Sequence, residues 1–185
     1  MNLRYPVTLA LVIGMMTAVG GCAGRQPQAA PATTAPVSQA TAHPSESNPV
    51  GDIPDDTVYL PFQPQGQGYE IKVPEGWSRG DLPTGATFTD KLNSVRVEIG
   101  APSDPSGAER VDQKTVSRSG GQARLTVFRM DSVPDAVTGK VIRDEVERYV
   151  FTKGGKQAVL TLTGPVGADN VDPWRTVSDS FRWTS

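Results

Sequence analysis

Cysteine and histidine are nearly absent from this chain. Its 185 residues include one Cys and one His, which are Cys22 and His43. A single cysteine cannot form an internal disulfide, so the folded part must be stable through its core alone. From residue 57 onward neither type occurs. This excludes Ser-His-Asp and Cys-His catalytic sites from that region, together with zinc or copper sites built on these ligands.

Blocks of one charge sign are missing as well. Residues 57–185 carry 16 Lys and Arg and 16 Asp and Glu, interspersed along the chain. Without a basic block the sequence offers no footprint for nucleic acid and no cluster for electrostatic docking on anionic lipid. Asp52, Asp55 and Asp56 form the tightest acidic cluster, but they lack the ligand spacing of a calcium loop. We expect no nucleic-acid partner, no metal and no cofactor.

Long hydrophobic runs are confined to the beginning of the chain. After a short cationic start, residues 7–19 form one apolar and small-residue stretch. This stretch is too short for a bilayer span, which needs about 20 residues. Its length and flanks are typical of a secretory signal peptide, which we expect over residues 1–21. The stretch ends in Val19, Gly20, Gly21 and Cys22.

These four residues resemble a bacterial lipobox, in which an aliphatic residue and two small residues precede an obligatory Cys. The resemblance implies that Cys22 receives a diacylglyceryl group and becomes the first residue of the mature chain. Two acyl chains anchor a protein stably, whereas one gives only marginal binding. We therefore expect a lipid-anchored protein on the extracytoplasmic face of the cell membrane. An incidental Cys22 within an ordinary signal peptide is the alternative.

A polar, proline-rich segment follows the lipobox. From Ala23 to about Asn48 the chain is mostly Ala, Pro, Thr, Ser and Gln, with no aromatic residue. Such a segment cannot bury enough apolar surface to offset its ordering entropy, which predicts disorder. As a flexible coil it would span roughly 30 Å. We expect a tether over residues 22–56, with His43 as a solvated linker residue, followed by one globular domain over residues 57–185.

Alternating apolar and polar residues dominate the predicted domain. They predict strands at residues 69–73, 86–90, 94–99, 123–130, 146–152 and 157–163. Residues 91–93 and 153–156 have the composition of hairpin turns. Strands with this alternation suit an antiparallel sheet that is covered on one face.

The clearest helix signal lies near the C-terminus. Asp169 or Asn170 is placed to cap the helix, and Pro173 suits its first turn. The apolar residues recur at spacings of three, three and four, at Val171, Trp174, Val177 and Phe181. A second, short helix is predicted over residues 104–114. One or two helices packed on an antiparallel sheet make an α+β sandwich, which is the fold class we expect.

Two short motifs resemble one known family. Residues 68–77, GYEIKVPEGW, resemble the opening of PsbP-like domains, and residues 172–183, DPWRTVSDSFRW, are similar to the terminal helix of that family. The resemblance implies an antiparallel sheet with helices on its faces. It also implies accessory roles in membrane complexes for some members.

Candidate functional side chains are few. Strand carboxylates suitable in principle for a two-carboxylate glycoside hydrolase are Glu70, Glu98, Glu145 and Glu147. Most aromatic residues are expected to fill the gap between sheet and helix, namely Trp77, Phe88, Phe128, Tyr149, Phe151, Trp174 and Phe181. The tryptophans Trp77, Trp174 and Trp183 are also the candidate contacts for a ligand or partner.

These observations leave three hypotheses for function. The first is a non-enzymatic, lipid-anchored module that docks on a membrane protein or surface complex. The second is a carrier of a small apolar or lipidic ligand, which requires a deep apolar pocket between sheet and helices. The third is a carboxylate-dependent hydrolase of envelope glycans, which requires two carboxyl groups facing one cleft. The first is the hypothesis that the sequence favours.

Overall fold

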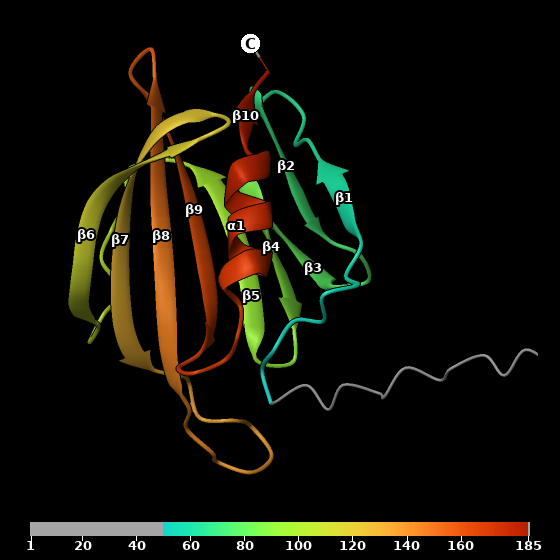
Figure 1. The fold of residues 1–185 in the computed structure, drawn as a ribbon, viewed down its shortest axis with the longest axis vertical. Helices are drawn as coiled ribbons and strands as arrows, with labels where there is room; N and C mark the ends of the chain where they lie inside the picture. The colour runs from blue at the N-terminus through green and yellow to red at the C-terminus, as the bar shows by residue number, and fades with distance from the viewer. Residues whose placement is uncertain (1–49, 185) are drawn as a thin grey trace, which may run out of the picture. The chain divides into compact units, whose positions relative to one another are not determined.

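Two antiparallel sheets and one helix make up residues 50–184, the part of the chain that the computed structural model describes (Figure 1). The main sheet has seven strands in the order β3-β4-β5-β9-β8-β7-β6, and the small sheet has three in the order β1-β2-β10. In chain order the elements are β1 (Tyr59–Phe62), β2 (Tyr69–Pro74), β3 (Ser78–Leu82), β4 (Gly85–Asp90), β5 (Asn93–Ile99), β6 (Glu109–Arg118), β7 (Gly121–Asp131), β8 (Arg143–Lys153), β9 (Lys156–Pro165), α1 (Val171–Ser180) and β10 (Arg182–Trp183).

Both predicted hairpins are present. β8 and β9 pair as far as Lys153 and Lys156, around a turn of Gly154 and Gly155. Both glycines have positive φ, 54° and 79°, as a two-residue type I′ hairpin turn requires. β4 and β5 also form a hairpin, but their ladder extends to Asn93, so its turn is one residue shorter than predicted.

One face of the main sheet, called here the inner face, is covered by α1 and the small sheet (Figure 1). Alternate residues of the central strands meet the helix and β2 in a single buried cluster. Phe181, just after the helix, stacks on Phe151 with ring centroids 4.1 Å apart and on Tyr69 at 5.8 Å. The predicted α+β class, an antiparallel sheet packed by a helix, is confirmed.

Helix α1 matches its predicted position but differs in two details. Trp174 and Val177 are buried as predicted, whereas Val171 is 72% exposed. Val171 is the first helical residue, so it lies beyond the layer against which the next turns pack. Asn170 occupies the N-cap position without making a capping bond, because its side chain oxygen accepts a hydrogen bond from the Ile53 amide instead.

The helix predicted over residues 104–114 is wrong. Residues 109–114 belong to β6, whose ladder with β7 provides long-range hydrogen bonds that override a weak local helical preference. Residues 100–108, the crossover segment, connect β5 to β6, which lie on opposite sides of β9, β8 and β7. The segment passes over the outer face of the sheet, where Arg148 donates hydrogen bonds to the carbonyl of Ser103 at 2.5 Å and to Asp104 at 2.6 Å.

A second buried cluster lies on the outer face. Phe128 was expected between sheet and helix, but it faces outward with Val146, Val150 and Val159. Alternation along β7 places Phe128 opposite to Leu125 and Val127, which belong to the inner face. The guanidinium of Arg148 lies 4.7 Å from the ring centroid of Phe128. The side chain of Arg148 is only 8% exposed, and its Nε is buried without a partner among the described residues.

Candidate interaction surface at the N-proximal end

The described chain begins at one end of the main sheet, called here the N-proximal end. The side chain amide of Asn93 donates a hydrogen bond to the carbonyl of Gly51 at 2.8 Å, and Gly51 packs against Pro165 at the end of β9. The amide of Val166 donates to the carbonyl of Arg143 at the start of β8, at 2.8 Å. The same end therefore carries the first described residues, the β4–β5 turn, the β7–β8 loop and the β9–α1 connection (Figure 1).

The β7–β8 loop, residues 132–142 and called here the valine loop, is ordered by its own hydrogen bonds. The Ser132 amide donates to the carbonyl of Ile142 at 2.8 Å, and the Ile142 amide donates to the Ser132 hydroxyl at 3.0 Å. Further along, the Asp135 amide donates to the Lys140 carbonyl at 2.9 Å. The loop thus continues the hairpin beyond the sheet, in the position that Figure 1 shows.

Asp135 organises the tip of the valine loop. Its carboxylate accepts hydrogen bonds from the amides of Val137 and Thr138, at 3.1 and 2.7 Å, and from the Thr138 hydroxyl at 2.8 Å. The backbone hydrogen bond from Thr138, followed by that from its hydroxyl, lowers the pKa of Asp135. This side chain–backbone pattern is a turn device that Asp supplies and an apolar residue cannot.

The ordered tip presents apolar side chains to solvent. Val133 is 88% exposed and Val137 is 92% exposed. Other exposed valines at the same end are Val50, Val141, Val166 and Val171. A surface on which several aliphatic side chains gather beside polar groups is typical of an interaction site, whereas single exposed apolar residues are ordinary.

The carboxylates that the sequence proposed separate into two groups. Glu145 and Glu147 follow one another on the inner face of β8 and line the same cavity, of about 60 Å³, beside Trp174. Glu70 pairs with Arg182 at 2.6 Å on the small sheet, and Glu98 pairs with Arg96 at 2.7 Å on the outer face. Only the first two therefore share a site.

Both carboxylates of this cavity have partners. Glu145 pairs with Arg129 at 3.2 Å, and Glu147 accepts a hydrogen bond of 2.7 Å from the hydroxyl of Tyr149. Burial, with Glu147 as a second cause, raises the pKa of Tyr149 to about 12. A cavity of 60 Å³ is far below the roughly 300–1,000 Å³ of sites that enclose organic ligands. The pair is suited to holding water or an ion-sized group, and the cavity is too small for a sugar ring.

The three candidate tryptophans do not meet. Trp174 lies on the buried side of α1. Trp183 packs edge-on against Phe181, with ring centroids 5.3 Å apart. Trp77 was expected to lie within the core, but it is half-buried at the margin, beside a surface hollow of about 350 Å³ that Ile53 and other N-proximal residues line. The gap in which a carrier would hold its ligand is occupied by core side chains.

Asparagine side chains hold the first described residues in place. Asn170 accepts a hydrogen bond from the Ile53 amide at 2.9 Å, and its amide group donates to Gly51 at 3.0 Å and to Asn93 at 3.1 Å. Ile53 is buried in the main core. Gly164 makes room for this arrangement, because a Cβ there would lie 2.6 Å from the oxygen of Asn93. We call these contacts the asparagine latch.

Several sequence predictions lie outside the described residues. These are the lipobox residues Val19, Gly20 and Gly21, the lipidation site Cys22, and His43. Within residues 50–184, no helix has the length and apolar character needed to cross a membrane. No group of three or more His, Cys, Asp or Glu in that range is placed to hold a metal ion.

No protein-family model and no curated protein sequence matches this chain. Three solved structures are similar in fold. A Bacteroides thetaiotaomicron protein is 10% identical with a TM-score of 0.41, and the match covers 64% of this chain but only 46% of the other. The cyanobacterial PsbP protein (CyanoP) of Synechocystis sp. PCC 6803 is 18% identical with a TM-score of 0.44, covering 74% and 99% of the two chains. The Ran-binding protein Mog1p of Saccharomyces cerevisiae is 12% identical with a TM-score of 0.44, covering 70% and 97%. These likenesses concern the fold, and none of them assigns a function to this chain.

Proposed function

We propose that this chain is a lipid-anchored, non-enzymatic accessory module that docks on a membrane protein or surface complex at the extracytoplasmic face of the cell membrane. The observation that carries the proposal is the valine loop, an ordered loop that holds Val133 and Val137 almost fully exposed. Burying a valine side chain contributes about 1.5–2 kcal/mol. Two such side chains on one ordered loop would form an anchor for a partner.

The order of the loop favours binding. A flexible loop loses conformational entropy when a partner fixes it, at about 0.5–1.5 kcal/mol for each immobilised side chain. The hydrogen bonds of Asp135 and Ser132 already hold the loop in one shape. Ordering of the valine loop therefore costs little free energy when a partner binds, which favours a docking role for this loop.

The non-enzymatic part of the proposal is supported by the cavity beside Glu145 and Glu147. The volume of about 60 Å³ leaves no room for the sugar ring that the hydrolase hypothesis requires. The ion pair with Arg129 and the hydrogen bond from Tyr149 engage the two carboxylates. Glu145 thereby connects β8 to β7, and Glu147 is bonded to a neighbour on its own strand, β8.

The anchor is supported by the lipobox resemblance at residues 19–22. We expect Cys22→Ser to prevent lipidation and to shift the protein from the membrane fraction to the medium. Fractionation and intact-mass measurement of the mature chain check this. Membrane retention of an unmodified Cys22→Ser chain would argue instead for an uncleaved N-terminal anchor.

The docking function is tested by crosslinking in the cells that produce the protein, followed by affinity purification and mass spectrometry. We expect one recurrent membrane or surface protein with the natural chain and its loss with the double variant Val133→Ser/Val137→Ser. The matched control is Val58→Ser, which changes another exposed valine and is expected to retain the partner. Equal recovery with the double variant and the control would remove the valine loop from the function.

A further inference from the structure

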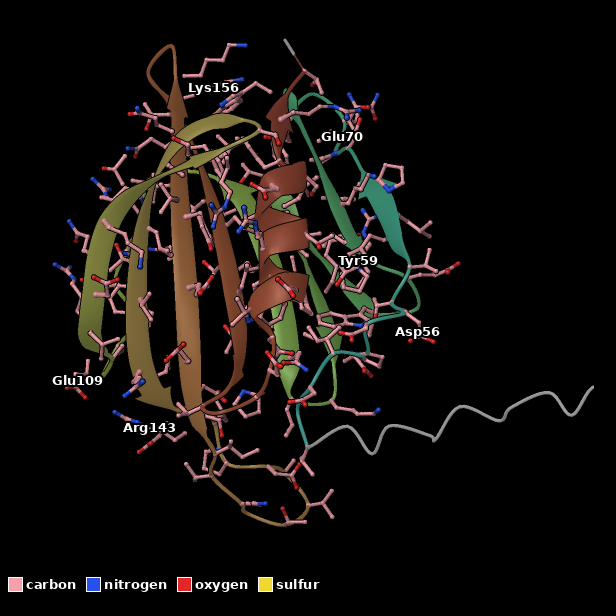
Figure 2. The ribbon with its side chains drawn as sticks, viewed as in Figure 1. Asp56, Tyr59, Glu70, Glu109, Arg143 and Lys156 are labelled. Carbon is pink, nitrogen blue, oxygen red and sulfur yellow. The ribbon has the colours of Figure 1, made fainter. Side chains whose placement is uncertain are left out.

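Several carboxylates lie on the elements that reach the N-proximal end, from which the valine loop also projects. Arg143 pairs with two of them, Asp131 at 3.2 Å and Glu109 at 3.3 Å, and Figure 2 shows Arg143 and Glu109 at this end. Five further carboxylates have no Lys or Arg within ion-pair distance among the described residues. They are Asp52, Asp90, Asp144, Asp169 and Asp172.

Carboxylates on other parts of the domain are mostly neutralised. Glu70, Glu98, Asp104 and Asp112 each form an ion pair with an Arg or Lys. The opposite end of the main sheet instead carries Lys153 and Lys156 in the β8–β9 turn, and Figure 2 shows Lys156 there. Asp55, Asp56 and Glu75 also have no ion pair among residues 50–184. At the N-proximal end the cations without an ion pair are Lys91 and Lys140, so the five unpaired carboxylates there outnumber them.

The length of chain before Val50 limits where a partner can be. Cys22 and Val50 are 28 residues apart in the sequence, a separation of at most about 100 Å when fully extended and roughly 30 Å as a coil. With the lipid anchor of the proposed function, the N-proximal end is the part of the domain tied closest to the membrane. A partner within about 100 Å of the bilayer surface is therefore within reach of this end.

We propose that the N-proximal end docks on a basic, membrane-proximal protein surface whose apolar recess receives Val133 and Val137. This inference rests on the proposed function and adds the chemistry of the partner. Lys or Arg around the recess would pair with Asp169, Asp172 and their neighbours, which speeds association and excludes acidic partners. The carboxylate of Asp135 is engaged within the loop and takes no part in this pairing.

The charges favour a protein over a lipid surface as the partner. Segments that bind membrane surfaces combine apolar side chains with clusters of Lys and Arg. The valine loop contains one cation, Lys140, and lies among acidic side chains. Insertion of its tip would bring more carboxylates than cations to the headgroups.

The test is site-specific photo-crosslinking with the full, lipidated chain in the cells that produce it. A photoreactive residue replaces Val137 in one strain and, as a control at the opposite end, Lys156 in another. We expect a recurrent protein adduct from position 137 and none from position 156. The adduct from position 137 should fall about fivefold when the two rim charges are removed in Asp169→Asn/Asp172→Asn.

A matched control removes the same charge elsewhere, in Glu98→Gln/Asp112→Asn, and should leave the adduct unchanged. Thermal melting of both pairs verifies that folding is retained, as expected for surface side chains. If the adduct from position 137 is unchanged in Asp169→Asn/Asp172→Asn, the partner surface is not basic and the inference is overturned. If position 137 crosslinks to lipid instead of protein, the partner is the bilayer and the inference is likewise overturned. Protein adducts from position 156 alone would overturn this inference and leave the proposed function standing. No protein adduct from either position, with no recurrent partner in purification, would overturn both.

Discussion

The substitution Gly164→Ala tests the asparagine latch with a single methyl group. The new Cβ would lie 2.6 Å from the Oδ1 of Asn93 and 2.9 Å from the Nδ2 of Asn170, both shorter than a carbon tolerates. Neither amide can simply turn away, because Asn93 also bonds Gly51 and Asn170 also bonds Ile53. The methyl group must therefore disrupt the latch or displace β9.

The expected loss of stability follows from these contacts. Separating Asn93 from Asn170 removes a hydrogen bond of 3.1 Å, worth about 1 kcal/mol. Crowding a well-packed site costs about 1–3 kcal/mol more. The total of about 2–4 kcal/mol corresponds to a fall in Tm of roughly 7–14 °C for a domain of this size.

Thermal and urea unfolding measure this loss against a control glycine. Gly80 on edge strand β3 has ordinary φ, and nothing lies within 4 Å of a Cβ built there, so Gly80→Ala should be neutral or slightly stabilising. In an Asn170→Ala background the penalty of Gly164→Ala should shrink, because the clash with Nδ2 is gone. A Gly164→Ala chain as stable as Gly80→Ala would refute the reasoning.

Other perturbations have equally definite outcomes. Arg148→Met keeps the packing of the stem but loses two hydrogen bonds to the crossover segment, so we expect unfolding to become easier by about 1–3 kcal/mol and hydrogen exchange to rise in residues 100–108. Burial raises the pKa of Tyr149 to about 12, so the unfolded chain loses this proton first as the pH rises. Its contribution to stability should therefore be lost between about pH 10 and pH 12, and Tyr149→Phe should reduce the alkaline decline in denaturant titrations. The part that remains belongs to groups such as Tyr69, whose pKa burial also raises. An unchanged alkaline limb in Tyr149→Phe would assign the decline to other groups.

Local patterns in the sequence predicted the elements that are stabilised locally. The β8–β9 hairpin depends on strict alternation and a Gly154-Gly155 turn, and both signals lie within twenty consecutive residues. β1, β3, β6 and β10 were not predicted, because each is defined by a partner strand more than by its own composition. Residues 104–114 contain helix-compatible residues, yet pairing with β7 makes their second half a strand.

The candidate interaction surface was harder to predict from the sequence than the fold. Of the three candidate tryptophans, Trp174 is buried in the core and the other two are partly buried at its margins. The sequence of the valine loop contains a weak indication of an exposed apolar loop. Val133, Val137 and Val141 lie among the turn-forming residues Pro, Asp and Gly, between two paired strands. Alternation alone does not reveal which valines face solvent, since exposure depends on how far the hairpin extends beyond the sheet.

The order of strands in the main sheet has a consequence for how the chain acquires its fold. β5 has β4 on one side and β9 on the other, while β2 pairs with β10 near the C-terminus. β5 and β2 therefore lack one of their partner strands until the last 30 residues of the chain are present. Such distant pairings make folding slow, because the entropy cost of closing long loops comes before the contacts that compensate for it.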